Sequence, residues 1–193
     1  MIATIPSQLL YIAAQFASND SQFKPNIALI NITFKNEQIT IRSTDGFRAF
    51  RCSFPMTSLF VMTQEELNVP AKVFKKRIAK GKYSIIHSDH VKVMNNVDEC
   101  IVMNPMQPNT TEIYPNVDNI WPDKFNNDPE NPVFFNAALL SDFLNEVKRF
   151  SENQCTKMVM NKPTNPLEFT AEIELYDVEY KIEYLLMPIN KRN

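Results

Sequence analysis

One short segment of this sequence carries side chains that could bind a metal ion. His87, Asp89 and His90 stand together in the segment His-Ser-Asp-His, and Cys100 lies ten residues further on. Imidazole, carboxylate and thiolate groups are the usual zinc ligands, but a zinc site needs three or four of them converging on one point. Two histidines three residues apart in a turn are more often ordinary surface residues. The sequence therefore predicts no metal site here.

A second segment is strongly basic. Four lysines and an arginine fall between residues 72 and 80, and Lys82 follows them. Such a cluster can contact phosphate groups, or it can simply be the solvated side of a helix. Both interpretations stay open, because the whole chain carries a formal net charge of −2 and gives no global electrostatic attraction to nucleic acid.

The sequence contains no recognisable catalytic constellation. Two glycines, Gly46 and Gly81, are too few for a G-x-G-x-x-G dinucleotide fingerprint and too far apart for a phosphate-binding loop. Five acidic residues near the C-terminus fall mostly at alternating strand positions, which is typical of a solvated sheet face; they are Glu172, Glu174, Asp177, Glu179 and Glu183. We therefore expect neither an enzyme nor a cofactor.

Composition indicates a globular cytoplasmic protein. Of 193 residues, 44% are hydrophobic and 22% are charged, both near the averages for folded domains. No apolar run reaches the roughly 18 residues that a membrane helix needs. The first apolar stretch has no basic residue before it, so it does not resemble a secretory signal. Three widely separated cysteines favour a reducing compartment.

The elements that position these residues recur three times along the chain. Apolar residues spaced by three and four predict a first helix over 5–17. Alternating residues predict strands over 26–33, 38–43 and 47–54, with a turn at Asn36 and Glu37. The second copy has a short strand over 67–69, a helix over 71–79 that Gly81 ends, and strands over 83–87, 91–95 and 99–103.

The third copy follows a loop rich in Pro, Asn and Asp. It has a short strand over 133–135 and a helix over 137–150 with Asn136 as its N-cap. The apolar stripe of this helix is expected to comprise Leu140, Phe143, Leu144 and Val147. Strands over 157–161, 167–175 and 179–187 complete the copy. Each copy is thus a βαβββ unit, although the signal for the leading strand is weak in the first copy. The fold class is α+β, with antiparallel sheets and helices on one face.

Four segments together resemble the bacterial DNA sliding clamp, the beta subunit of DNA polymerase III. The segment STDGFRAFRCSFP over 43–55 is similar to a strand–turn–strand of the clamp's middle domain. The segment YPNVDNIWP over 114–122 is similar to the exit from that domain, FFNAALLSDFL over 134–144 to the helix that opens its last half-domain, and YLLMPI over 184–189 to its C-terminal strand.

This resemblance implies a domain organisation. Residues 1–122 would form one complete clamp domain, made of units at about 1–65 and 66–113 and an exit segment at 114–122. Residues 123–131 would be a linker and residues 132–193 a half-domain. The clamp's first domain and the first half of its last domain have no counterpart in this sequence. The third unit is left without an internal partner, which predicts self-association around a two-fold axis, because an uncovered sheet edge and apolar surface are liabilities.

The resemblance also implies two kinds of site. Clamps bind short peptides of polymerases, loaders and repair proteins in a groove between the middle and last domains, and apolar Met and Leu side chains suit that task. The matching residues are Thr44, Gly46, Phe47, Arg48, Pro115, Ile120, Pro166, Leu167, Leu185, Met187, Pro188 and Ile189. Arg48 and Arg51 are expected on one strand face, at the groove or at the DNA edge.

Clamp helices line a channel around double-stranded DNA and contact its backbone without reading sequence. The matching basic residues are Lys72, Lys75, Lys76, Arg77, Lys80, Lys82, Lys148 and Arg149. The implied function is a non-enzymatic sliding clamp of replication or repair that binds partner peptides and encircles DNA as a homo-oligomer. Clamp rings of this family contain twelve such units, which four copies of this chain would supply. The alternative is a clamp mimic that does not slide and competes for clamp-binding peptides.

Overall fold

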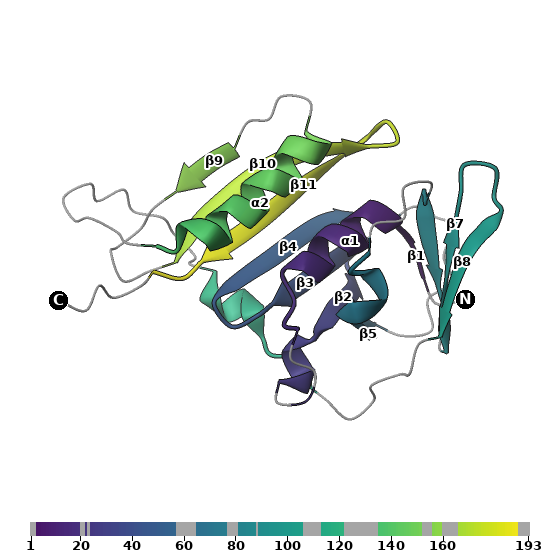
Figure 1. Ribbon diagram of the computed structural model, residues 1–193, viewed down its shortest axis with the longest axis horizontal. Helices are drawn as coiled ribbons and strands as arrows, with labels where there is room; N and C mark the ends of the chain where they lie inside the picture. Colours follow the sequence, from purple (N-terminus) through teal and green to yellow (C-terminus); the bar gives the residue numbers. More distant parts are fainter. Residues whose placement is uncertain are drawn as a thin grey trace.

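The computed structural model describes residues 3–19, 22, 24–56, 65–76, 81–87, 89–105, 113–121, 135–151, 156–159 and 166–188. These residues form two antiparallel sheets of four and seven strands with two α-helices (Figure 1). The first unit comprises β1 (Ala3–Pro6), α1 (Ser7–Gln15), β2 (Leu29–Lys35), β3 (Gln38–Thr44) and β4 (Arg48–Pro55), with a 3₁₀ turn η1 (Pro25–Ile27) before β2.

The second and third units repeat this order with shorter or missing parts. The second comprises β5 (Glu66–Pro70), the 3₁₀ turn η2 (Ala71–Phe74), β6 (Tyr83–Ile86), β7 (His90–Met94) and β8 (Cys100–Pro105). A 3₁₀ turn η3 (Val117–Ile120) follows. The third comprises α2 (Ala137–Phe150), β9 (Thr156–Val159), β10 (Leu167–Leu175) and β11 (Val178–Leu186). The short strand expected over 133–135 lies mostly outside the described residues.

The first two units exchange their first strands. β1 pairs with β6 of the second unit, and β5 pairs with β2 of the first, so each sheet contains an edge strand from the other unit. The four-stranded sheet has the order β1-β6-β7-β8. This exchange links the two units by main-chain hydrogen bonds as well as by side-chain packing.

The third unit extends the sheet of the first. β11 pairs antiparallel with β4 over five residue pairs, from Ile182 opposite Cys52 to Leu186 opposite Arg48. The resulting seven-stranded sheet has the order β5-β2-β3-β4-β11-β10-β9. Figure 1 shows α1 and α2 on the same face of this sheet, which places helices of the first and third units in one layer.

The burial of side chains along β10 shows which face of the seven-stranded sheet the helices cover. In β10 the residues at odd positions from Leu167 to Leu175 are buried under the helix layer, while Glu172 and Glu174 are exposed on the other face. Below, the covered side is called the helix face and the opposite side the outer face. Aromatic rings join the two halves of the helix-face core: the Phe16 ring of the first unit lies 5.3 Å from Tyr184 and 6.5 Å from Phe143 of the third unit, between ring centroids.

Three expectations about the helices need correction. The first helix begins at Ser7 rather than Ile5, because Ile5 and Pro6 belong to β1 and pair with β6. In the second unit the described part of the predicted helix is only η2, whose two buried anchors, Ala71 and Phe74, are three residues apart, the repeat of a 3₁₀ helix. On α2, Leu144 is 43% exposed and does not belong to the buried stripe.

The third helix and the hairpin turns confirm the sequence-based expectations. α2 spans the predicted residues, and the Asn136 side chain accepts a hydrogen bond from the Ala138 amide, as an N-cap does. Asn36 and Glu37 both have positive φ, the conformation of a two-residue hairpin turn. No helix among the described residues is long and apolar enough to cross a membrane.

Candidate functional site

The turn that leads into β4 is built by its own polar side chains. The Thr44 hydroxyl donates to the Arg48 carbonyl at 2.7 Å and accepts from the Gly46 amide at 3.1 Å. The Asp45 carboxylate accepts from the amides of Phe47 and Arg48. Gly46 has φ of +92°, a conformation that side-chain-bearing residues rarely adopt. The turn therefore needs this glycine and presents Phe47, which is 61% exposed.

Arg48 lies on the helix face and not in a groove. Its side chain is 9% exposed and forms ion pairs with Asp45 at 2.9 Å and with Asp142 of α2 at 2.7 Å. It also donates to the Gln15 carbonyl at the end of α1, and its guanidinium lies 5.1 Å from the Phe16 ring centroid. The two carboxylates raise the pKa of Arg48 despite the opposing effect of burial. Arg48 thus joins α1, β4 and α2.

Arg51 lies on the opposite face, so the expectation that the two arginines share one strand face is wrong. Side chains alternate along a strand, and residues three apart must point to opposite sides. Arg51 donates to Glu183 of β11 at 2.6 Å and lies with its guanidinium 4.4 Å from the Trp121 ring centroid. It therefore belongs to the outer face.

A small second apolar cluster covers the outer face where β4 meets β11. It contains Leu185 and Ala49 from paired strands and Val117 and Trp121 from the η3 region, together with Leu29 and Tyr114. Leu185 is fully buried in this cluster. The described part of the exit segment, residues 114–121, which the family resemblance assigns to the same groove as the terminal strand, is thus packed against that strand.

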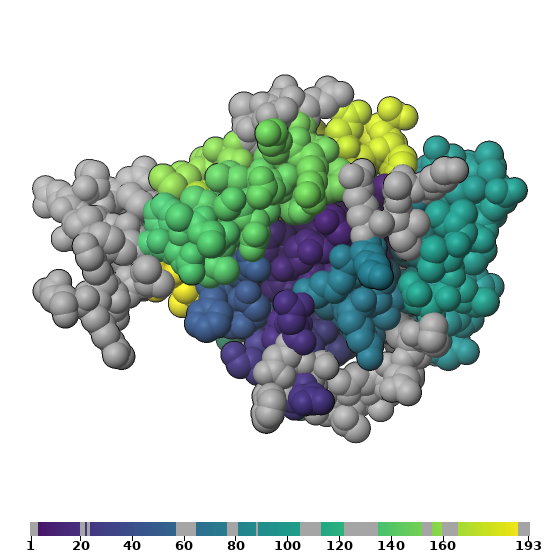
Figure 2. Space-filling model, viewed as in Figure 1, coloured from purple at the N-terminus to yellow at the C-terminus, as the bar shows by residue number. Residues whose placement is uncertain are grey.

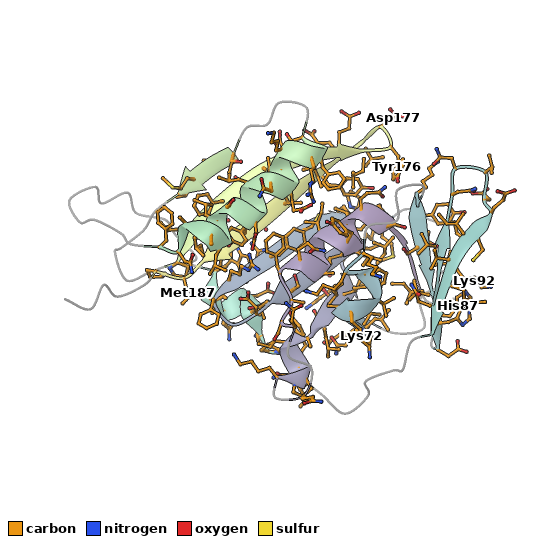
Figure 3. The ribbon with its side chains drawn as sticks, viewed as in Figure 1. Lys72, His87, Lys92, Tyr176, Asp177 and Met187 are labelled. Atoms are coloured by element: carbon orange, nitrogen blue, oxygen red, sulfur yellow. The ribbon has the colours of Figure 1, made fainter. Side chains whose placement is uncertain are left out.

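Three exposed apolar residues border this cluster. Phe47 directly precedes β4 and Met187 directly follows β11, and each is two residues from a cluster member, so continued alternation places both on the outer face. Their main chains are joined, because the Met187 amide donates to the Phe47 carbonyl at 3.0 Å. Ile120 follows in η3, next to Trp121, and is 38% exposed, while Met187 is 36% exposed. Figure 3 labels Met187 at the end of β11. We call Phe47, Ile120 and Met187 the apolar trio.

Asp118 fastens η3 to the sheet. Its carboxylate accepts two hydrogen bonds from Arg42, at 3.0 and 2.7 Å, and a longer one from Arg51 at 3.4 Å. These arginines hold the pKa of Asp118 below its usual range, although its partial burial acts in the opposite direction. The pKa of Glu183 is lowered for the same reason, by Arg51 and Lys181. The sequence did not indicate this network, because the residues that are hydrogen-bonded lie far apart in the chain. Arg42 and Asp118 are separated by 76 residues, and Arg51 and Glu183 by 132 residues.

Two open polar hollows flank η3. One, of about 290 Å³, is lined by Arg51, Lys181 and Glu183 among others. The other, of about 200 Å³, is lined by Asn31, Glu66 and Pro115 among others, and Arg42 and Asp118 border both. Both hollows are lined mainly by polar and charged side chains.

The remaining groove candidates are placed less favourably. Leu167 is 1% exposed and lies in the main core on the helix face, so it is not part of the outer-face surface. Pro166 and Pro188 are half-buried next to the ends of β10 and β11. Ile189 lies outside the described residues. The structure thus brings together Phe47, Ile120, Leu185 and Met187, and separates Arg48 and Leu167 from them.

Most of the described basic candidates lie on the helix side of the molecule. Lys72 and Lys76 are exposed beside η2, and Lys148 and Arg149 are exposed on α2. Arg149 donates to the hydroxyl of Tyr11 on α1, so the end of α2 approaches α1. Figure 2 shows α2, α1 and the η2 region side by side on one face. Arg77 and Lys80 lie outside the described residues.

Two of the lysines interact with other groups of the protein. The Lys75 ammonium donates to the Ala17 carbonyl at 3.0 Å, and burial together with Arg48 lowers its pKa. The Lys82 ammonium lies 5.7 Å from the Tyr176 ring centroid. These two contribute less to an exposed basic surface than Lys72 and Lys76 do.

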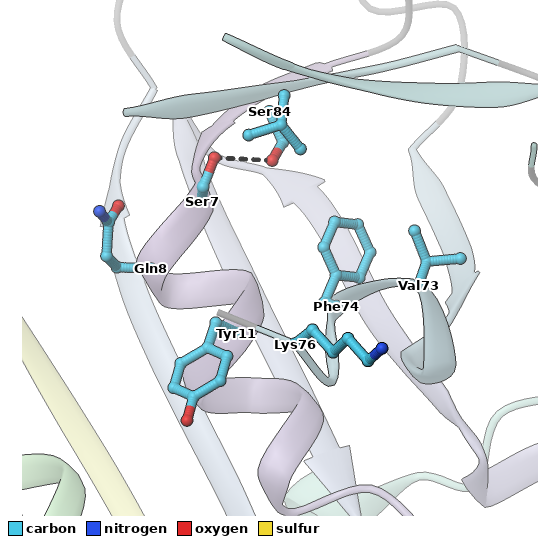
Figure 4. Close-up of a pocket in the computed structure, with 8 residues that line it drawn as sticks. Ser7, Gln8, Tyr11, Val73, Phe74, Lys76 and Ser84 are labelled. Atoms are coloured by element: carbon cyan, nitrogen blue, oxygen red, sulfur yellow. Dashed lines mark hydrogen bonds between the residues drawn. The ribbon is translucent and has the colours of Figure 1, made fainter. Parts of the chain in front are cut away.

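A small cavity lies where α1, η2 and the four-stranded sheet meet (Figure 4). Its volume is about 20 Å³, room for a single water molecule. Ser7 and Ser84 are hydrogen-bonded to each other at 2.8 Å beside it. The cavity is a packing feature between the first two units.

The rings of His87 and His90 stack face to face, with their centroids 4.2 Å apart. Among the described residues, no group of three potential ligands could hold a metal ion.

Similarity to known proteins is visible in the three-dimensional structure. No family model and no curated protein matches the sequence. The β subunit of DNA polymerase from Streptococcus pyogenes matches over 99% of this chain with a TM-score of 0.67 and 14% identity. The Helicobacter pylori β clamp in complex with diflunisal matches over 97% with a TM-score of 0.69 and 13% identity. The DNA polymerase III β subunit of Thermotoga maritima matches over 98% with a TM-score of 0.62 and 12% identity.

These matches show that the chain has the fold of the bacterial DNA sliding clamps. The matched part spans 65 to 66% of those chains. The chain therefore has a clamp-like fold and spans about two thirds of the length of those chains, which confirms the resemblance found in the sequence motifs.

Proposed function

We propose that this protein is a non-enzymatic, clamp-like factor of DNA replication or repair that binds short peptides of partner proteins on its outer face. The observation that carries this proposal is the apolar trio beside the Leu185–Trp121 cluster, where the first and third units meet. The fold supports it, because the proteins that match are polymerase β subunits and clamps. We expect the protein to be located in the cytoplasm.

The chemistry of the trio suits an extended peptide with apolar anchors. Met187 is flexible and polarisable and can adapt to different partner side chains. Phe47 and Ile120 offer further apolar area, and the neighbouring hollows carry both charge signs on Arg51, Lys181 and Glu183. A few buried anchors supply most of the affinity of such sites.

Replacing Met187 by alanine is expected to weaken binding of a Gln-Leu-x-Leu-Phe peptide about tenfold, since loss of one apolar anchor costs on the order of 1.4 kcal/mol. Fluorescence anisotropy of a labelled peptide measures this. Val178→Ala is the matched control, because Val178 is also apolar and 49% exposed but lies in the far β10–β11 hairpin. If the peptide binds and Met187→Ala leaves its affinity unchanged, the site is misplaced; if the peptide does not bind, the function is wrong.

We further propose that the helix face contacts the backbone of double-stranded DNA. The exposed cations on this face come from two units, Lys72 and Lys76 from the second and Lys148 and Arg149 from the third. The described part of α1 has no charged residue to oppose them. Phosphate contacts of this kind bind without reading sequence and weaken as salt rises.

The double change Lys72→Glu and Lys76→Glu is expected to weaken DNA binding and to lower the slope of log affinity against log salt by about 2, one for each lost phosphate contact. The control is the double variant Lys35→Glu and Lys157→Glu, which changes the net charge by the same amount. Both lysines are exposed and lie on strands, at positions of the outer face. Equal loss in both variants would contradict a helix-face site. Retention on circular DNA that is lost on linearisation distinguishes an encircling clamp from a clamp mimic that does not slide.

Encircling DNA requires assembly of several copies. The domain division into 1–122 and 132–193 is part of this proposal. In the first two units the outer edge of the sheet is completed by a strand from the partner unit, whereas in the third unit the sheet ends at β9 among the described residues. We propose that the third units of two copies complete each other around a two-fold axis.

A further inference from the structure

The larger of the two polar hollows on the outer face, of about 290 Å³, is built on three adjacent strands. Arg42 of β3 and Arg51 of β4 lie directly opposite each other, which is destabilising for like charges unless an anion lies between them. The lining comes from β3, β4, β11 and η3, and comprises Thr40, Arg42, Arg51, Ser53, Asp118, Lys181 and Glu183.

The carboxylates of this hollow already have donors within the protein. Both oxygens of Asp118 accept hydrogen bonds from Arg42, and one of them also accepts from Arg51. In Glu183, Oε2 accepts from Arg51 at 2.6 Å and Oε1 accepts from Lys181 at 3.2 Å. Every oxygen of the two carboxylates is therefore in use.

Donors remain on the opposite side of this balance. Arg51 uses Nε and Nη1 for the two carboxylates, and its Nη2 has no partner among the described residues. Lys181 is 60% exposed and donates to one carboxylate oxygen, although its ammonium group has three hydrogens. The hydroxyls of Thr40 and Ser53 share one hydrogen bond, which leaves a hydroxyl hydrogen without a described partner. Three cations also face two carboxylates, so the hollow has one positive charge in excess.

We propose that this hollow binds the carboxylate of an acidic side chain of the same partner peptide that the apolar trio anchors. A carboxylate carries one negative charge, which matches the excess, and its two oxygens can accept from the remaining donors. A phosphate group would bring more negative charge close to Asp118 and Glu183, which oppose it. The inference rests on the proposed peptide binding and adds a second, charged contact to it.

The place of the hollow relative to the trio sets where the acidic residue stands in the peptide. η3 joins the two, because Asp118 lines the hollow and Ile120 belongs to the trio. Glu183 of β11 precedes Met187 by four positions, which is roughly 13 Å at about 3.3 Å per residue. The acidic residue is therefore expected at least about four residues from the apolar side chain that contacts Met187.

The test compares pairs of labelled peptides on the full chain by fluorescence anisotropy. Each peptide contains Gln-Leu-Ser-Leu-Phe and a Gly/Ser arm that ends, about five residues from the motif, in Glu or in Gln. One pair carries the arm before the motif and the other carries it after the motif, so that both peptide directions are covered. In one pair the Glu peptide is expected to bind about fivefold more tightly than the Gln peptide, and this gain should shrink as salt rises.

A charge reversal locates the gain in the hollow. Lys181→Glu is expected to abolish the preference for Glu and to create one for an arm that ends in Lys, because the excess charge becomes negative. Lys157→Glu is the matched control, since Lys157 is also an exposed lysine on the outer face but lies on β9, two strands from β11. It should keep the preference for Glu. Circular dichroism shows that both variants are folded.

The outcomes separate this inference from the function on which it rests. If the Gln peptides bind and Glu gains nothing in either position, the carboxylate site is wrong and the peptide function stands. A preference for Glu that survives in Lys181→Glu, or is lost equally in Lys157→Glu, also overturns the site, because the gain then comes from elsewhere on the surface. If none of the peptides binds, the peptide function is wrong, and the carboxylate site is wrong with it.

Discussion

Replacing Arg48 by methionine is expected to lower the free energy of unfolding by about 3 kcal/mol, the range for breaking a buried ion pair from one side. Arg48 is 9% exposed and pairs with Asp45 and Asp142. Its removal also leaves the Gln15 carbonyl without this donor. Methionine retains an apolar stem of similar length, so the loss reports mainly the guanidinium. Urea unfolding followed by far-ultraviolet circular dichroism measures it.

Two comparisons make this prediction specific. Lys148→Met removes an exposed cation from the same layer and is expected to change stability by less than about 0.5 kcal/mol. Asp142→Asn should cost less than Arg48→Met, because Asp142 is 54% exposed and shares Arg48 with Asp45. A loss below about 1 kcal/mol in Arg48→Met would show that the pairs are not structurally important. Because Arg48 joins α1, β4 and α2, weaker peptide binding in an Arg48 variant would not by itself locate a groove.

The strands and turns could be predicted because their signals are local. Asn36 and Glu37 adopt the left-handed conformation of a tight hairpin, and Asn136 caps α2, both within a few residues of the pattern that indicated them. β1 is different, since its partner Tyr83–Ile86 lies about 80 residues away. The sequence pattern gave only a weak strand signal at the position of β1, and the predicted helix included Ile5. Strand exchange between units is set by tertiary pairing, which local spacing does not encode.

Only part of the site could be predicted from the sequence, because the rest of the site also depends on tertiary contacts. Alternation identifies which residues of β4 and β11 share a face, but not which face the helices cover. Leu167 and Leu185 belong to neighbouring strands and look alike in sequence, yet Leu167 lies under the helices and Leu185 under η3. Asp118 carried no local signal at all, because its importance comes from Arg42 and Arg51 on two separate strands.

Phe143→Ala is expected to lower the free energy of unfolding by about 4 kcal/mol, from lost burial and from the cavity left behind. Phe143 is fully buried and contacts rings of three elements. It stacks on Tyr184 and lies 6.2 Å from Phe169 and 6.5 Å from Phe16 between ring centroids. Leu144→Ala is the matched control at the next position of α2, where the side chain is 43% exposed, and is expected to cost less than about 1 kcal/mol.

The same variant tests whether the first and third units unfold as one body. Trp121 is the only tryptophan of the chain and lies on the outer face, with the sheet between it and Phe143. Because β4 and β11 share hydrogen bonds and the Phe16–Phe143 contact joins the two helices, the transition seen by Trp121 fluorescence should shift together with that seen by circular dichroism. Trp121 packs against residues of both β4 and β11, so a circular dichroism transition that no longer coincides with the Trp121 transition would show that the two units do not unfold together. A peptide site that takes Met187 from one unit and Phe47 from the other could not then be rigid, and the coincidence of the two transitions is therefore a requirement of the proposed function.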